Sequence, residues 1–397
     1  MSLLLSLSRY PIDWTIRVIA LCLLVQISMS TNLWQCQDRF FFQLPLISTW
    51  PLDFLCAVDQ WLYYSLFISL LALLWKPTSK LLLASFLLLL GLLLLQDLNR
   101  LQVWLFQLAG MLFIALAYHR DRPEVTLLQW QCVLLSVYFW GALQKFNVYF
   151  IRDTVPWLVE DWGMAEWFEH SPFLGYGLAL IELLMVLGLW LPRTRSWAFA
   201  LVSLFHLLLL FLLGPLGKNW NPIVWPWNLV QIILVFLLFF NQKTPIRFSA
   251  LKSQINNQLL ALAMTTLLVI GPLMSFFGDW PEPLSFKMYA GTNPEAVLYW
   301  EEKTPVCLPN TIEDLIIDLS SSTHPEKRYL LVDKWALREL GVPPFVSQYR
   351  LKQFGAKFCE CLEYPDIGGM DILLVNRWQL DQEQMVHYSC KELLKSN

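Results

Sequence analysis

The sequence predicts an all-α, polytopic membrane helical bundle of about nine spans, followed by a small extracytoplasmic α+β domain. Of the 397 residues, 56% are hydrophobic and only 15% are charged, whereas a soluble domain carries about 25% charged residues. Several segments approach or exceed the roughly 20 apolar residues that cross a bilayer as a helix. After Phe277 the composition becomes mixed, and no apolar run of that length follows.

Nine hydrophobic spans are expected, with polar or basic turns between them. The third is an almost pure leucine stretch, Leu81 to Leu95, and it ends in the polar turn Gln96 to Arg100. Many of the 20 tryptophans stand at span ends, which is typical of the aromatic belts at the two membrane interfaces; stacking on a ligand at the outer side is the alternative. The spans are expected at 12–30, 57–75, 81–96, 101–118, 127–147, 174–192, 196–214, 222–240 and 258–277.

Basic residues predict the orientation, because cytosolic loops are enriched in Lys and Arg. The opposite loops hold fewer of them, namely Arg39, Arg100, Arg152 and Lys218. The N-terminus is therefore expected in the cytosol and, after an odd number of spans, the C-terminal domain outside it. One span more or fewer would move that domain to the other side. The N-terminus and the alternate loops carry Arg9, Lys76, Lys80, Arg120, Arg122, Arg193, Arg195, Lys243, Arg247 and Lys252.

Two domains are expected: a multi-span transmembrane domain over residues 1–277 and a soluble domain over 278–397. About 120 residues are enough for one small domain. Within it, β-branched and aromatic runs between turn residues predict strands at 284–290, 296–301, 315–319, 329–332 and 370–376. Helices are expected at 333–340 and 345–358, the first closed by Gly341.

Six of the eight cysteines fall on the side predicted to be extracytoplasmic. An oxidising compartment favours structural disulfides there, and their pairing cannot be derived from sequence alone. Cys359-Glu-Cys361 is a closely spaced pair that could instead serve redox chemistry or bind a metal, although no second pair stands at metal spacing. The six are Cys36, Cys56, Cys307, Cys359, Cys361 and Cys390.

The principal candidate for a functional residue is Lys145, near the outer end of the fifth span. An ionisable residue inside a span is a functional-site hypothesis by default, and the polar Gln144 and Asn147 flank it. The alternative is a snorkelling lysine whose amine reaches outer water. Removal from water disfavours the charged form of a lysine, so in a dry pocket it can serve as a neutral amine base.

Two further ionisable residues stand within spans, Glu182 in the sixth and His206 in the seventh. A polar group without a partner in hydrocarbon is costly, so both are expected to face the bundle interior or water. The loop 148–173 is rich in acids and tryptophan, and we expect an amphipathic interfacial helix there. This loop, the turn 97–100 and Lys145 would then meet at one outer rim.

Other chemistries lack their sequence signatures. The chain holds no P-loop, no G-x-G-x-x-G, no G-x-S-x-G and no H-E-x-x-H. Five histidines without a close pair argue against a metal site, so no metal cofactor is predicted. A net charge of −3 gives no indication of nucleic acid as a partner.

Several of these segments together resemble the vitamin K-dependent γ-carboxylase family and its bacterial relatives, the horizontally transferred transmembrane domain proteins. Tyr138-Phe-Trp-Gly-Ala-Leu-Gln-Lys-Phe-Asn147 resembles the family's run around its catalytic lysine, on which Lys145 falls. Trp167-Phe-Glu-His-Ser-Pro-Phe173 and Ser203-Leu-Phe-His206 resemble two later motifs, and Pro51-Leu-Asp53 also fits. The resemblance covers roughly residues 10–240, in order.

The resemblance implies a base chemistry at the membrane. Such carboxylases oxidise a reduced quinone with O2, and the strong base so formed removes a proton from a protein glutamate, to which CO2 adds. It implies Lys145 as the base, and we expect His206 as a catalytic partner and Arg100 as an electrostatic clamp. Arg100 takes the place of a family histidine and cannot accept a proton, so the glutamate substrate is not carried over. Residues expected to bind the reduced, vitamin K-like quinone are Asn99, Gln144, Asn147, His170 and Glu182.

Three functions remain open at this point. The first is quinone chemistry with Lys145 as base. The second is a non-enzymatic membrane scaffold that presents the C-terminal domain to an extracytoplasmic protein partner. The third is a thiol-redox membrane protein that uses Cys359 and Cys361. Membrane lipid is an expected partner in all three.

Overall fold

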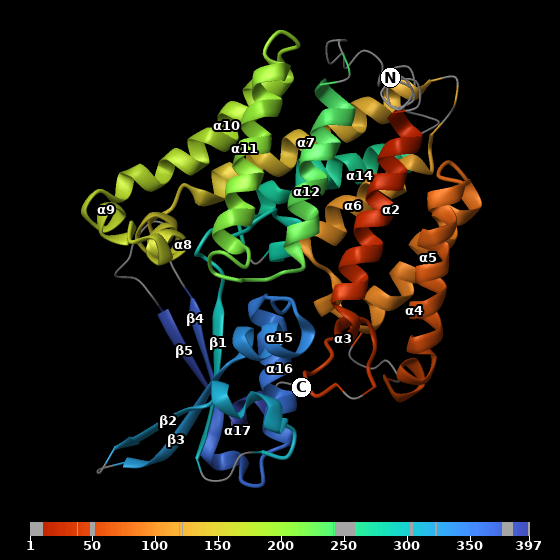
Figure 1. Ribbon diagram of the computed structural model, residues 1–397. Helices are drawn as coiled ribbons and strands as arrows, with labels where there is room; N and C mark the ends of the chain where they lie inside the picture. Colours follow the sequence, from red (N-terminus) through yellow and green to blue (C-terminus); the bar gives the residue numbers. More distant parts are fainter. Residues whose placement is uncertain are drawn as a thin grey trace. The chain divides into compact units, whose positions relative to one another are not determined.

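The chain is mainly helical, with one small antiparallel sheet near the C-terminus (Figure 1). The computed structural model describes residues 11–37, 39–47, 52–118, 120, 122–240, 242, 259–278, 280–301, 305–321, 324–374 and 384–395. The basic residues Arg9, Lys243, Arg247 and Lys252, used above for the orientation, lie outside these ranges.

The chain divides into two units. Unit 1 comprises Met1–Met29, Trp61–Leu92 and Gln102–Gly291, and unit 2 comprises Ser30–Gln60, Leu93–Leu101 and Thr292–Asn397. The boundary expected after residue 277 therefore falls inside unit 1. Two polar segments between apolar helices belong to the same unit as the C-terminal sheet.

Apolar helices coincide with all nine segments expected to span the membrane. Six are long and apolar enough to cross a bilayer: Pro11–Met29, Cys56–Trp75, Pro123–Lys145, Pro172–Trp190, Arg195–Leu213 and Leu259–Phe276. The other three are shorter, at Lys80–Gln96, Val103–Ala115 and Val224–Phe240. These helices, counted within the described residues, indicate a multi-pass membrane protein.

Helix α7 is the most enclosed of the six long helices. Of its apolar stretch 83% is buried, against 28% for the segment that includes α10 and 33% for α11, so α10 and α11 present apolar faces outward. The helices are α2 (Pro11–Met29), α3 (Thr31–Trp34), α4 (Leu52–Trp75), α5 (Lys80–Gln96), α6 (Val103–Ala115), α7 (Pro123–Lys145), α8 (Val155–Val159), α9 (Ala165–His170), α10 (Tyr176–Trp190), α11 (Arg195–Leu213), α12 (Val224–Val235) and α14 (Leu259–Val269).

The segment between α7 and α10 is a series of short helical pieces, not the single interfacial helix expected from its composition. Helices α8 and α9 have five and six residues. Gly163 separates them with φ +65°, a left-handed conformation that ends a helix. Trp167 and Phe173 are 72% and 77% exposed, so this segment still offers large apolar side chains to its surroundings.

Unit 2 contains a five-stranded antiparallel sheet in the order β2-β3-β1-β4-β5. Ala296, Leu298 and Trp300 alternate as the buried residues of the central strand β1, and Trp300 packs against Phe358 with ring centroids 5.8 Å apart. The elements are β1 (Glu295–Glu301), β2 (Ile317–Ser321), β3 (His324–Leu331), β4 (Gly368–Leu374), β5 (Gln384–Ser389), α15 (Val332–Leu340), α16 (Gln348–Glu360) and α17 (Cys390–Lys395).

Four of the five expected strands correspond to β1–β4, and both expected helices correspond to α15 and α16. The strand expected at 284–290 is wrong. This segment is a loop in which Phe286 and Tyr289 both have φ +51°, a left-handed conformation incompatible with a strand. The edge strand β5 was not expected, because its exposed residues lack a clear alternation of apolar and polar side chains.

Two disulfides confirm the expectation of structural bonds among the predicted outer cysteines. Cys36 pairs with Cys56, and Cys359 in α16 pairs with Cys390 at the start of α17. The closely spaced Cys359 and Cys361 are therefore not bonded to each other. Cys361 and Cys307 are free thiols.

Candidate functional site

A largely apolar cavity lies within unit 1 among α7, α10, α11, α12 and the loop that follows α14. Its volume is about 50 Å³. This is room for a few water molecules, and it is smaller than the cavity of about 150 Å³ that accommodates benzene, so a ring could enter only if side chains moved. The polar residues in its wall are Tyr138, Lys145, Glu182, His206, Asn228 and Tyr289.

Lys145, in the last turn of α7, forms a buried ion pair with Glu182 of α10. Its Nζ lies 2.9 Å from Glu182 Oε1, 3.0 Å from Oε2 and 3.0 Å from the backbone oxygen of Gly141. The two residues are 8% and 4% exposed. The snorkelling alternative is therefore wrong, because the amine is directed at partners within unit 1.

A glycine makes room for this ion pair. A Cβ atom at Gly141 would lie 3.2 Å from Glu182 Oε2 and 3.7 Å from Lys145 Nζ. Gly141 stands four residues before Lys145, which places both on one face of α7. The absence of a side chain at 141 therefore lets the carboxylate reach the lysine.

A second polar chain in the wall runs from Tyr138 through His206 to Asn228. The Tyr138 hydroxyl lies 3.0 Å from His206 Nε2, and His206 Nδ1 lies 2.8 Å from Asn228 Oδ1. Asn228 Nδ2 donates to the backbone oxygen of Val224, so its oxygen is the atom that faces the histidine. Since this oxygen only accepts, His206 carries its proton on Nδ1, and its Nε2 accepts from Tyr138.

The periodicity of α7 explains why these residues meet. Tyr138, Gly141 and Lys145 are spaced by three and four residues, so they share one face of the helix. Glu182 and His206 reach the same cavity from α10 and α11. The structure thus brings together Lys145, Glu182 and His206, which the sequence had singled out separately.

Gln144 and Asn147 lie beside this site but do not line the cavity. Gln144 Nε2 donates to Ser275 Oγ at 2.6 Å. Asn147 Nδ2 donates to the backbone oxygens of Gln144 and Ala290, each at 2.8 Å. Their contacts attach the loop after α14 to the end of α7, which is a positioning role.

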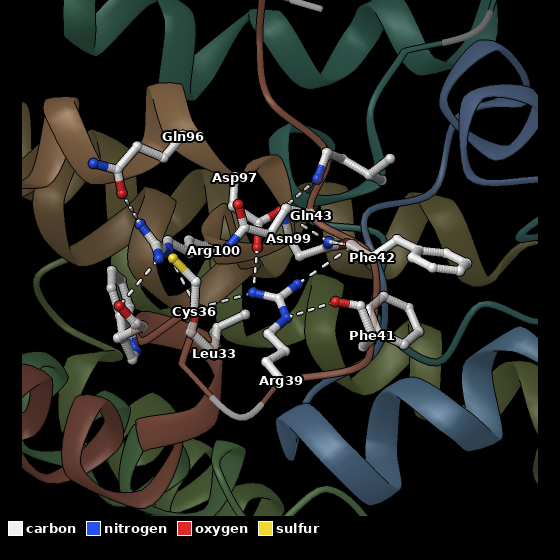
Figure 2. A network of polar contacts seen from close by, with 12 residues as sticks. Leu33, Cys36, Arg39, Phe41, Phe42, Gln43, Gln96, Asp97, Asn99 and Arg100 are labelled. Atoms are coloured by element: carbon white, nitrogen blue, oxygen red, sulfur yellow. Dashed lines mark hydrogen bonds and ion pairs between the residues drawn. The ribbon is translucent and has the colours of Figure 1, made fainter. Parts of the chain in front are cut away.

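Arg100 belongs to unit 2 and is fully buried in a network of polar contacts (Figure 2). It is not among the residues that line the cavity. Because each of its five N–H groups already has an acceptor, it offers no donor to a ligand in this conformation. These acceptors, at 2.8–3.1 Å, are the backbone oxygens of Leu33, Trp34 and Leu93 and the side chains of Gln96 and Asp59.

The same network contains Asn99. Its amide nitrogen donates to Asp97 Oδ1 at 2.9 Å, and its amide oxygen accepts from the backbone N–H of Phe345 at 3.0 Å. Asp97 also pairs with Arg39 at 2.6 Å, as Figure 2 shows. Asn99 and Arg100 therefore hold together the segments of unit 2, and neither lines the cavity.

His170 is exposed at the end of α9, where its Nδ1 lies 2.7 Å from the backbone oxygen of Glu166. It does not line the cavity either.

Three polar residues of the cavity were missed as site residues: Tyr138, Asn228 and Tyr289. Tyr138 stood in the motif around Lys145, seven residues before it, and helical spacing could have placed it on the lysine's face. Tyr289 carried no such signal, because its loop was expected to be a strand. Its hydroxyl is buried and has no hydrogen-bond partner, a situation that costs about 1–3 kcal/mol.

Within the described residues, no group of three or more His, Cys, Asp or Glu side chains could hold a metal ion. No protein-family model matches the chain, and neither a curated protein nor a solved structure matches it.

Proposed function

We propose that this multi-pass membrane protein binds a lipid-soluble ligand with an acidic hydroxyl group in the cavity, and that the Lys145–Glu182 pair removes the hydroxyl proton. A reduced quinone is the ligand class. The observation that carries the proposal is a buried ion pair in the wall of a largely apolar cavity. Ionisable groups inside membrane spans face interior sites and mark functional pathways.

The apolar surroundings favour a ligand from the bilayer. Phe150, Phe205 and Trp227 contribute aromatic surface to the cavity wall, which suits an aromatic ring. Helices α10 and α11 expose apolar side chains such as Leu184 and Leu204, as expected where lipid covers them. A ring entering from the bilayer would bring its hydroxyl to the ion pair once side chains of the wall had moved apart, because the cavity of about 50 Å³ is smaller than a ring needs.

The proton can be followed atom by atom. In the resting pair the lysine is an ammonium and Glu182 a carboxylate, since Nζ meets both carboxylate oxygens. Transfer of one proton from Nζ to Glu182 yields a neutral amine and a neutral acid, which an apolar cavity tolerates because neither is charged. The amine then takes the ligand's hydroxyl proton. The result is Lys145 as an ammonium beside the ligand oxyanion, with Glu182 protonated.

Tyr138 is placed to orient the ligand hydroxyl. Its own proton points to His206 Nε2, since that nitrogen accepts. The lone pairs of the Tyr138 oxygen remain for a donor in the cavity. The chain Tyr138–His206–Asn228 therefore presents an acceptor of fixed direction to the ligand's O–H group.

The proposal also includes the orientation of the protein in the membrane and its resemblance to a known family. Nine spans with a cytosolic N-terminus would leave the C-terminal domain outside the cytosol, in a compartment suited to the two disulfides of unit 2. The resemblance to the vitamin K-dependent γ-carboxylase family supports Lys145 as the base. The protein glutamate substrate of that family is not part of the proposal.

The decisive experiment is quinol turnover by purified protein in lipid nanodiscs. Reduced menaquinone or vitamin K is supplied with O2, and products are followed by mass spectrometry for wild type, Lys145→Met and Glu182→Gln. Lys76→Met is the matched control, because Lys76 is exposed at the end of α4. Oxygenated quinone is expected from wild type and control and at least about 100-fold less from the two cavity variants. No product from folded wild type would contradict the proposal.

A non-enzymatic scaffold is the second candidate. The observation that favours it is that the five N–H groups of Arg100 all serve unit 2. By the resemblance, Arg100 would replace a histidine of the carboxylase family. A scaffold would keep its cellular function in the double variant Lys145→Met with Glu182→Leu, in which no buried charge remains, whereas the quinol proposal requires the loss of that function.

A further inference from the structure

The Tyr289 hydroxyl is the unsatisfied polar group of the cavity. It is buried and has no hydrogen-bond partner. The other nitrogen and oxygen donor atoms of the lining side chains each have a hydrogen-bond partner: those of Lys145, Tyr138, His206 and Asn228 as described, and Trp227 Nε1, which donates to Gln107 Oε1 at 2.9 Å. Native proteins leave few buried polar groups unpaired, so each one calls for an explanation.

Tyr289 has an unfavourable backbone conformation, which its surroundings hold in place. Tyr289 has φ +51°, which is rare for a bulky residue and is found where surrounding contacts enforce it, often at ligand sites. Asn147 Nδ2 bonds to the oxygen of the next residue, Ala290. At Gly291, where φ is +71°, a Cβ would lie 2.8 Å from Thr154 Oγ1, so the chain passes too closely for any other residue.

The ring of Tyr289 is anchored in apolar surroundings. It packs against the buried cluster of Leu158, Val159 and Leu213. Burial, together with the charge of Glu282, raises the pKa of Tyr289 above its usual value. The phenol is therefore a neutral donor at physiological pH, and an acceptor oxygen that entered the cavity would satisfy it.

We propose that Tyr289 donates a hydrogen bond to a second oxygen of the ligand, distinct from the hydroxyl that the Lys145–Glu182 pair deprotonates. The site then selects rings that carry two oxygens, such as a hydroquinone, over rings with one. This inference rests on the proposed function, because it assigns one oxygen to Lys145. It makes Tyr289 a specificity residue and gives Asn147 the positioning role of holding its loop.

The test compares two probes of known chemistry in nanodiscs under anaerobic conditions. One is a prenylated naphthohydroquinone, and the other is the corresponding naphthol, which lacks the second oxygen. Affinities are measured by quenching of tryptophan fluorescence for wild type, Tyr289→Phe and the control Tyr64→Phe, whose parent side chain is 49% exposed. Tyr289→Phe is expected to weaken the hydroquinone about 2- to 10-fold and to leave the naphthol unchanged.

The outcomes separate the two proposals. If Tyr289→Phe weakens both probes equally, or neither, the inference is overturned while the proposed function stands. If wild type binds neither probe, the proposed function fails and the inference fails with it. A readout without ligand is the unfolding temperature, which Tyr289→Phe should leave unchanged or raise because it removes an unpaired hydroxyl. A clear fall would reveal a structural partner and would also overturn the inference.

Discussion

Lys145 and Glu182 join α7 to α10 through an ion pair in which one ammonium meets both carboxylate oxygens, at 2.9 and 3.0 Å. Gly141 supplies the space and a third acceptor for the ammonium. Such a pair contributes little net stability compared with apolar side chains of the same volume, because two charges leave water to form it. Its burial is therefore weak evidence for a stabilising role.

Replacing one residue of this pair should destabilise the protein more than replacing both. Lys145→Met leaves Glu182 uncompensated, and we expect a loss of about 3–5 kcal/mol. The double variant Lys145→Met with Glu182→Leu should recover most of it, since no buried charge remains. Thermal unfolding in detergent, followed by scanning fluorimetry, measures both.

Lys76→Met again serves as the matched control and should change stability by less than about 0.5 kcal/mol, as exposed substitutions usually do. A double variant that is less stable than either single variant would show that the pair itself stabilises the bundle, contrary to this expectation.

The tautomer of His206 gives a spectroscopic prediction. Its contacts with Tyr138 and Asn228 require a neutral ring with the proton on Nδ1. In protein labelled with ¹⁵N-histidine, one ring should show a protonated Nδ1 and an unprotonated Nε2, and this signal should vanish in His206→Gln. The opposite tautomer would mean that Tyr138 accepts from His206 and that its proton is free for the ligand.

Part of this site could be predicted because ionisable residues are rare inside spans. Lys145, Glu182 and His206 stood out in apolar sequence, and all three line the cavity. Tyr138 and Asn228 did not stand out, since tyrosine and asparagine also serve as ordinary packing and capping residues. Which side chains face one another depends on the rotation of each helix about its axis, and long apolar segments carry little periodicity from which to derive it.

The fold, too, could be predicted from the sequence only in part. Composition located each apolar segment that forms a helix, but it gave no sign that Ser30–Gln60 and Leu93–Leu101 belong to unit 2. That association depends on pairings between distant residues, such as Cys36 with Cys56 and Arg39 with Asp97. A sequence shows which residues are charged or are cysteines, but it does not show which of them form ion pairs or disulfides with one another.

The disulfides predict a defined count of thiols. The structure describes all eight cysteines, with four in disulfides and four free. Alkylation of the denatured, unreduced protein should therefore modify four cysteines, and eight after reduction. Mass spectrometry of the intact protein reads the count directly.

Substitution should lower the stability much more at Cys359 than at its neighbour Cys361. Cys359→Ser opens a bond to Cys390 across a sequence separation of 31 residues, which should lower stability by about 2–4 kcal/mol. Cys361→Ser, two positions away and free, should change it by less than about 1 kcal/mol. Equal effects would mean that Cys361 also takes part in a bond.

Asp97 makes the stability of unit 2 dependent on pH. Burial alone would raise the pKa of its carboxyl, but the charges of Arg39 and Arg100 outweigh burial and hold the pKa below its usual value. In the unfolded chain the pKa of an aspartate carboxyl is about 3.9. Because the folded-state pKa is the lower one, the stabilisation by Asp97 is fully present above about pH 4 and is lost as the pH falls through the folded-state pKa.

Asp97→Asn should therefore destabilise unit 2 by about 3–5 kcal/mol at pH 7, because Arg39 loses its buried partner. The difference from wild type should shrink progressively below about pH 4.

Unfolding midpoints at pH 7, 5, 4 and 3 test the effect of Asp97→Asn. The control is Asp318→Asn, since Asp318 pairs with Arg328 and its side chain is 63% exposed. The control should stay within about 1 kcal/mol of wild type at every pH. A difference for Asp97→Asn that stays constant down to pH 3 would contradict a lowered folded-state pKa, because a carboxyl that stays ionised in the fold while the unfolded chain takes up a proton must lose stabilisation below about pH 4.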